Sequence, residues 1–193
     1  MRRVCVFCGS SAGAGTAYAG GARRLGEALV AAGTGLVYGG AHVGLMGILA
    51  DTVLAAGGEV TGVIPHALEE LEIAHRGLTS LHVVGSMHER KALMAELADG
   101  FISLPGGIGT LEEMFEILTW AQLGLHRKPC GLLDVDGYFV GLLQFLDRMV
   151  DQGFLRTVHR EMILVESEPE RLLARFESYQ PPGVVKWIDR AQS

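Results

Sequence analysis

The chain has 193 residues, of which 49% are hydrophobic and 20% are charged, a composition that excludes intrinsic disorder and leaves room for one domain. Sixteen Lys and Arg residues against 22 Asp and Glu residues give a net charge of −6. The chain therefore carries no overall basic field that would hold nucleic acid or an anionic membrane, and any anion that it binds must meet a local site.

The predicted elements alternate along the chain between short β-rich runs and longer amphipathic runs. The predicted strands lie at 3–8, 35–38, 59–64, 80–84, 100–104, 130–133 and 162–165. The predicted helices lie at 16–32, 44–56, 87–98, 111–123, 138–152 and 169–178. This alternation predicts an α/β fold, namely a Rossmann-like, doubly wound and mostly parallel sheet with helices on both faces. We expect residues 1–180 to form one domain and residues 181–193 to form a C-terminal tail.

The apolar runs are too short for a membrane span or for the core of a signal peptide. Residues 28–32 form one of the longer runs, whereas a span needs about 20 residues. The N-terminus is basic and then apolar over residues 1–8, and it runs directly into a glycine turn. Three cysteines, an odd number, do not suggest a disulfide scaffold. We therefore expect a cytoplasmic protein.

Glycine is the compositional outlier, with 27 of 193 residues, about twice its average usage of about 7%. Three glycine-rich turns follow predicted strands, at 9–15, 39–47 and 105–110. Open parallel sheets bind ligands at the carboxyl ends of their strands, near the point where strand order reverses. These turns are therefore the expected ligand site.

The turn at 105–110 leads directly into a predicted helix. Such a turn exposes backbone N–H groups beside the positive end of the helix dipole, which suits a phosphate, and the Thr110 hydroxyl adds a donor. The same residues also fit a capping box, in which Thr110 and Glu113 would only start the helix. Spacing alone leaves both interpretations open.

Two common nucleotide motifs are excluded. No Gly-Lys pair occurs in the sequence, which rules out a Walker A loop. The dinucleotide fingerprint fails because Tyr18 stands where its third glycine is required, and because no carboxylate follows the second strand at Gly39 and Gly40. We therefore expect neither ATP hydrolysis of the P-loop type nor NAD binding.

The helix predicted at 87–98 presents a cation on its inward face. Arg90 shares its stripe with Leu93 and Met94, so it needs an anionic partner, which is either a structural carboxylate or a ligand. Lys91 by itself would most often be a solvated side chain.

The helix predicted at 111–123 carries the candidate acids. We assign its apolar stripe to Leu111, Met114, Phe115 and Leu118. Its other sides then carry Glu112, Glu113, Glu116 and Thr119. Acidic residues early in a helix favour its dipole, which is one explanation for all three carboxylates. Glu113 also lies one turn inside the candidate phosphate site, where a carboxylate can stabilise a developing cation or orient a water, as N-glycoside cleavage requires.

Redox and metal chemistry are not expected. Cys5 and Cys8 have redox spacing, but residues i and i+3 of a strand point to opposite faces, so core packing is the preferred interpretation. The seven histidines are scattered without a Cys/His cluster, and we expect no metal.

The segments Pro105–Glu113 and Met87–Lys91 resemble the LONELY GUY (LOG) family, whose signature is Pro-Gly-Gly-x-Gly-Thr-x-x-Glu. Further similar segments lie at 7–11, 37–40, 44–47, 98–101 and 119–124, so the resemblance covers roughly residues 3–180. Members of the family are cytokinin riboside 5'-monophosphate phosphoribohydrolases. The resemblance implies hydrolysis of the bond between purine N9 and ribose C1′, which releases a free base and ribose 5-phosphate.

The resemblance also implies roles for individual residues. Arg90 and Glu113 match the catalytic pair. Substrate-binding positions match Glu72, Lys91, Gly106, Gly107, Ile108, Gly109, Thr110, Leu111, Glu112 and Thr119. We add, as candidate substrate contacts, Gly9, Ser10, Gly39, Gly40 and Met87. One departure is Ala41-His42, where many members have a small pair such as Gly-Ser. The resemblance implies no metal or organic cofactor, and a homodimer or larger homo-oligomer with sites near the subunit interface.

Three other functions stay open. A general hydrolase of AMP and other nucleoside monophosphates would use the same chemistry with a less demanding base pocket. A carrier that holds an anionic ligand without turnover, like the molybdenum-cofactor carriers that share this fold, is disfavoured by the presence of both Arg90 and Glu113. A lysine decarboxylase, a label often given to the family, would need pyridoxal phosphate on Lys91, Lys128 or Lys186.

Overall fold

A computed structural model describes residues 1–69 and 73–183 of the chain. Glu72 and residues 184–193 of the predicted tail therefore lie outside the described residues. In the described part the chain forms one seven-stranded sheet in which every pairing is parallel. Its strands are β1 (Arg3–Phe7), β2 (Gly35–Tyr38), β3 (Val60–Pro65), β4 (Ser80–Val84), β5 (Gly100–Ser103), β6 (Cys130–Leu133) and β7 (Ile163–Glu166).

The longer helices alternate with these strands. They are α1 (Ala17–Ala31), α2 (Gly44–Ala55), α4 (Met87–Leu97), α5 (Ile108–Gln122), α6 (Val140–Asp151) and α8 (Pro169–Glu177). Shorter helical turns are α3 (His66–Glu69), η1 (Val135–Gly137) and α7 (Thr157–Arg160). No helix in residues 1–69 and 73–183 is both long and apolar enough to cross a membrane.

The predicted fold class is confirmed, with differences at particular element ends. Each predicted strand is present, and each predicted longer helix has a counterpart. The helix expected at 111–123 begins three residues earlier, at Ile108. The helix expected at 138–152 begins later, at Val140, because the residues before it form the 3₁₀ turn η1. The four-residue helices α3 and α7 were not predicted, since one turn is too short to show a helical period.

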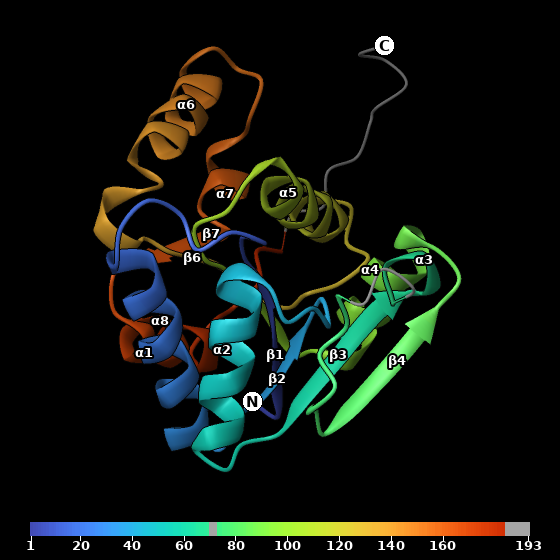
Figure 1. Ribbon diagram of the computed structural model, residues 1–193. Helices are drawn as coiled ribbons and strands as arrows, with labels where there is room; N and C mark the ends of the chain where they lie inside the picture. Colours follow the sequence, from blue (N-terminus) through green and yellow to red (C-terminus); the bar gives the residue numbers. More distant parts are fainter. Residues whose placement is uncertain (70–72, 184–193) are drawn as a thin grey trace.

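The sheet is covered on both faces, as Figure 1 shows. On one face α1, α2 and α8 contribute a core that includes Leu25, Leu49 and Phe176. On the other face α4, α5 and α6 contribute a second core, with Met94, Ile117 and Leu146 among its members. The inner strands are buried on both faces, which explains why their sequences read as apolar runs without clear alternation, whereas the edge strand β4 is partly exposed.

The strand order places the reversal point at β1. The order is β4-β3-β2-β1-β5-β6-β7, so β1 lies between β2 and β5, and the chain winds in opposite directions from it. Connections that leave β1 and β5 therefore diverge to opposite faces of the sheet. The crevice between them, outside the carboxyl ends of the strands, is where such folds bind ligands.

Candidate active site

The three glycine turns meet at the carboxyl edge of the sheet. The backbone N–H of Gly9 donates to the carbonyl of Pro105 at 3.1 Å. The carbonyl of Gly9 in turn accepts from the N–H of Leu45, at the start of α2, at 3.0 Å. The turn after β1 is thus tied to the other two turns by backbone hydrogen bonds alone.

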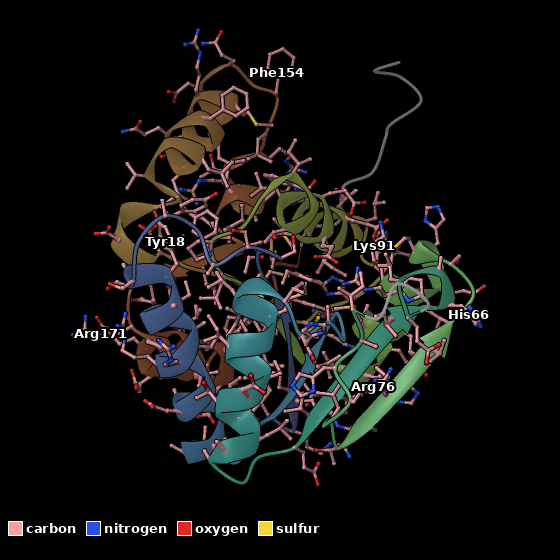
Figure 2. All side chains as sticks on the ribbon, in the orientation of Figure 1. Tyr18, His66, Arg76, Lys91, Phe154 and Arg171 are labelled. Carbon is pink, nitrogen blue, oxygen red and sulfur yellow. The ribbon has the colours of Figure 1, made fainter. Side chains whose placement is uncertain are left out.

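A cavity of about 300 Å³ lies at this junction. Its lining combines the backbone of residues 9–13 and 105–107 with Leu45 and with two aromatic side chains, Tyr18 and Tyr138. Figure 2 labels Tyr18 at the N-terminal end of α1. The predicted residues Gly9, Ser10, Gly106 and Gly107 therefore share one cavity at the reversal point of the sheet.

The N-terminus of α5 opens beside this cavity without a side-chain cap. Its N-cap residue is Gly107, and no side chain there accepts a hydrogen bond from the first turn. The capping-box interpretation is therefore wrong, because Thr110 lies inside the helix and cannot cap it. Thr110 is buried, and its side chain occupies the space where a Cβ on Gly106 would stand. Uncapped N–H groups at the positive end of a helix dipole suit an anion.

Arg90 and Glu113 form a buried ion pair between α4 and α5. The Nη1 group of Arg90 donates to Oε1 of Glu113 at 2.8 Å, and its Nε donates to the carbonyl of Val63 at 3.2 Å. Arg90 is 8% exposed and Glu113 is 9% exposed. The anionic partner expected for Arg90 is thus a carboxylate of the same chain. The hydrogen bond from Arg90 to the carbonyl of Val63, in β3, could not be predicted from the sequence.

Burial and pairing act in opposite directions on the Glu113 carboxyl. Burial raises its pKa, and the neighbouring Arg90 lowers it, with a net pKa above the ordinary value for Glu. The carboxylate is therefore poorly solvated and is held in its ionised form mainly by one guanidinium. Such a carboxylate is well suited to stabilise a developing positive charge beside it.

Gly39 brings the second glycine turn against this pair. A Cβ on Gly39 would overlap with Nη2 of Arg90, so only glycine leaves room for the guanidinium. Gly40 follows with a φ of +76° and accepts a backbone hydrogen bond from His75. Next to it, Ala41 bridges to Ala74, and the His42 ring bonds to the carbonyl of Ile73. Residues 73–75 thus pack along the turn that carries the Ala41-His42 departure.

Lys91 is buried, contrary to the expectation for a lone lysine. Its Nζ lies 2.5 Å from Oε1 of Glu112 and 3.0 Å from Oε2 of Glu116. Burial alone would lower the pKa of Lys91, but the two carboxylates outweigh it and raise the pKa above its ordinary value. Figure 2 shows Lys91 in the space between α4 and α5. The contacts of Lys91 therefore join these two helices.

The buried face of α5 differs from the predicted apolar stripe. The buried residues are Thr110, Glu113, Met114, Ile117, Leu118 and Ala121. Glu113 was expected on a polar side of the helix, and Phe115 was expected in the stripe but is 36% exposed. The pattern of apolar residues therefore predicts the wrong inward face for α5. One of the inward positions is Glu113, a charged residue paired with Arg90, and such a position does not appear in an apolar pattern.

The remaining candidate residues of α4 and α5 are not part of the Arg90 and Glu113 ion pair. Met87, the first residue of α4, and Ile108, the first of α5, are exposed, as is Gly109, whereas Leu111 is half-buried. Thr119 lies eleven residues beyond Ile108 on α5, where its hydroxyl donates to the carbonyl of Phe115. It lines a separate cavity of about 210 Å³ with residues of α6 and α7. Within this chain, Thr119 is not brought to the Arg90 and Glu113 pair.

The structure is that of a Rossmann-like α/β protein with three glycine turns at one edge of its sheet and a buried Arg–Glu pair beside them. Comparisons with known proteins show the family to which the chain belongs. A family model described as "Possible lysine decarboxylase" matches residues 46–176. The chain is 50% identical over 182 residues to rice (Oryza sativa subsp. japonica) "Probable cytokinin riboside 5'-monophosphate phosphoribohydrolase LOGL5", covering 94% of this chain and 74% of the relative.

A second relative and a solved structure extend this result. Cytokinin riboside 5'-monophosphate phosphoribohydrolase LOG7 of Arabidopsis thaliana is 49% identical over 181 residues, which cover 94% of this chain and 83% of that protein. The molybdenum cofactor binding protein of Rippkaea orientalis superposes with a TM-score of 0.69 at 21% identity, covering 92% of this chain and 96% of that chain, which shows a shared fold. The chain belongs to the LONELY GUY (LOG) family.

Proposed function

We propose that this protein is a phosphoribohydrolase that cleaves the N-glycosidic bond of cytokinin riboside 5'-monophosphates, which are N6-modified forms of AMP. The products are the free cytokinin base and ribose 5-phosphate. The observation that carries the proposal is the buried ion pair of Arg90 and Glu113, 2.8 Å apart, beside an uncapped glycine loop. The names of the relatives, at 47–50% identity, support the same activity.

The site divides the reaction between two regions. The backbone N–H groups of residues 106–110, with the Thr110 hydroxyl, hold the 5′-phosphate. Glu113 faces the ribose in its ionised form and stabilises the positive charge that builds at C1′ as the bond to N9 breaks. Water supplies the hydroxyl at C1′, and its second proton leaves with the base. Arg90 keeps Glu113 ionised and positions the substrate.

The other candidate residues are proposed as substrate contacts around this centre. Gly9 and Ser10 border the cavity proposed for the phosphate, whereas Gly39 lies against the guanidinium of Arg90 and Gly40 follows it in the same turn. Met87 and Lys91 belong to α4, and Glu112, which pairs with Lys91, belongs to α5. Glu72 and Thr119 are proposed from the family resemblance alone. We propose no metal and no organic cofactor for the reaction.

The lysines do not suit decarboxylation through pyridoxal phosphate, despite the description attached to the family model. A Schiff base needs a neutral amine, which a lowered pKa would favour. Lys91 instead has a raised pKa between two carboxylates, and the amine of Lys128 donates to the carbonyl of Ala95 at 2.7 Å. Lys186 lies outside the described residues. The two described lysines therefore do not fit the cofactor.

We also propose that the protein acts in the cytoplasm as a homodimer or larger homo-oligomer, and that residues 1–180 form its single domain. The apolar side chains on the outer surface of α5 and α6 support an assembly, because Phe115 and Phe145 are 36% and 60% exposed. Sedimentation at micromolar concentration tests this, and a monomer would contradict it.

The substrate preference is tested by comparing rates of base release from isopentenyladenosine 5′-monophosphate and from AMP. We expect a higher kcat/KM for the prenylated nucleotide. Equal values would identify a general nucleoside-monophosphate hydrolase. Binding of both nucleotides without release of base would instead identify a carrier, and the proposed enzyme would be rejected.

A further inference from the structure

Tyr138 makes a specific bond to the glycine loop although it is not part of the core. Its side chain is 43% exposed, and its hydroxyl donates to the carbonyl of Gly106 at 2.6 Å. Its ring meets the ring of Tyr18 edge to face, with centroids 5.6 Å apart and planes at 79°. Because Tyr18 follows the turn after β1 and Tyr138 follows β6, these two residues join three neighbouring segments around the cavity of about 300 Å³.

The backbone around Tyr138 is held in an unusual conformation. Asp136 has a φ of +56°, and in residues 1–69 and 73–183 it is the one residue other than glycine with a positive φ. Such a conformation persists when its surroundings enforce it, and it is commonest at functional sites. On the other side, Phe139 is buried, and its N–H donates to Asp134 at 2.8 Å. Tyr138 is therefore fixed from both directions.

The hydrogen bond from Tyr138 sets the direction of a peptide group in the phosphate loop. A trans peptide is planar, so its carbonyl and the following N–H point in opposite directions. Fixing the carbonyl of Gly106 thus fixes the N–H of Gly107, the N-cap residue of α5. Glycine has wide conformational freedom, and without this bond the loop has more orientations to lose on binding. The hydroxyl hydrogen of Tyr138 is donated to the carbonyl of Gly106, so Tyr138 would influence a bound phosphate through the loop and not by donating to it directly.

We propose that Tyr138 is a positioning residue for the phosphate end of the nucleotide. Its hydroxyl holds the Gly106 to Gly107 peptide ready for the phosphate, while its ring and that of Tyr18 wall the cavity. The ligand class is a sugar 5-phosphate. This inference rests on the proposed function, which placed the phosphate at the loop.

The test is calorimetric binding of ribose 5-phosphate to the wild type, to Tyr138→Phe and to Tyr179→Phe. Tyr138→Phe keeps the ring and removes the hydrogen bond, and we expect its dissociation constant to rise about three- to tenfold, as the loss of one neutral hydrogen bond predicts. Tyr179→Phe removes a phenol hydroxyl outside the site and should bind like the wild type. Adenosine, which has no phosphate, should bind equally to all three proteins.

Two results would overturn the assignment. One is unchanged affinity of Tyr138→Phe for ribose 5-phosphate, and the other is an equal loss of affinity for adenosine, which would indicate a general structural role.

In steady-state assays Tyr138→Phe should raise KM for the nucleotide more than it lowers kcat. If the wild type hydrolyses nucleotides and Tyr138→Phe binds normally, the assignment fails and the proposed function stands. If the expected binding shift appears but no nucleotide is hydrolysed, the proposed function fails and the assignment stands.

Discussion

At the scale of single residues, the central feature is a carboxyl group under two opposing influences. Glu113 is buried, which disfavours its charge, and it accepts a hydrogen bond from Arg90, which favours its charge. The net effect is a pKa above the ordinary value. The proposed reaction needs the carboxylate form, because a neutral carboxyl group would not stabilise a cation at C1′.

The pH dependence of the reaction follows from this raised pKa. Glu113 is protonated below its pKa and ionised above it, so activity should rise with pH through that pKa. We therefore expect the acid limb of kcat/KM to lie above 4.5, the ordinary value for Glu. An acid limb at or below 4.5 would contradict this assignment.

Arg90 should oppose the effect of burial on Glu113. In Arg90→Gln the lowering influence is lost, so the pKa of Glu113 should move to a still higher value. Carbon NMR titration of the labelled carboxyl group measures this shift without requiring activity. A downward shift in the variant would show that Arg90 does not stabilise the carboxylate.

Gly39 offers a test of how closely the guanidinium must be packed. A methyl group in Gly39→Ala would overlap with Nη2 of Arg90, so either the ion pair or the turn must shift. Overpacking of this kind costs about 1–3 kcal/mol, and we expect kcat to fall at least about tenfold because small misplacements at a catalytic centre are costly. Gly141→Ala, which meets open space on α6, is the matched control. Equal activity of both variants would count against the proposed role of Arg90.

At the scale of the elements, the sequence predicted the strands well and the helix faces less well. β2, β4 and β6 begin and end at the predicted residues, because short apolar runs bounded by glycine or polar residues are clear signals. The orientation of α5 was missed since the buried position 113 is charged. The start of α6 was predicted two residues early, because the Asp136-Gly137 pair signals a turn but does not show how many residues pass before the helix begins.

The sequence predicted the location of the candidate site and its charged pair, but not the two tyrosines that line its cavity. Glycine turns after parallel strands predicted the edge of the sheet where the structure has a cavity, and the resemblance to the LOG family pointed to Arg90 and Glu113, which the structure brings together. The sequence singles out Tyr18 only because it stands where a dinucleotide motif requires glycine, and it does not single out Tyr138 as a site residue. Both tyrosines line the cavity through contacts between segments that lie far apart in the sequence, and a local pattern contains no information about such contacts.

The contact between α4 and α5 leads to a prediction about stability. Lys91 pairs with Glu112, whose side chain is 52% exposed, and with Glu116, whose side chain is 25% exposed. Exposed pairs are screened by water and contribute little, whereas more buried pairs are costly to break. We expect Glu116→Gln to lower the free energy of unfolding by about 1–2 kcal/mol, and Glu112→Gln by less than about 1 kcal/mol. Urea unfolding measures both, and the reverse order would contradict this account.

At the scale of the whole molecule, the two helical layers bury all three cysteines. Cys5, Cys8 and Cys130 are free thiols inside the sheet region, and burial raises the pKa of each well above its ordinary value. A thiol is reactive as the thiolate, so none should react while the chain is folded. We expect an aromatic disulfide reagent at pH 8 to label no cysteine in the native protein and three per chain in guanidinium chloride. Rapid labelling of the native protein would show that the sheet opens.

The fold of the whole molecule does not by itself decide the chemistry. The same architecture occurs in a molybdenum cofactor binding protein at 21% identity, so an open parallel sheet with a glycine loop is compatible with binding as well as with hydrolysis. We propose that the carboxylate of Glu113, paired with Arg90, is what makes this protein an enzyme. On this proposal, a few side chains at the edge where the strand order reverses decide the function.

The most direct test of the central claim is to quantify both products from isopentenyladenosine 5′-monophosphate with the wild type and with Glu113→Gln. We predict equimolar release of free base and ribose 5-phosphate by the wild type. In the folded variant, release should fall by about a hundredfold or more, while nucleotide binding persists. Release at the wild-type rate by Glu113→Gln, or release of inorganic phosphate in place of ribose 5-phosphate, would contradict the account.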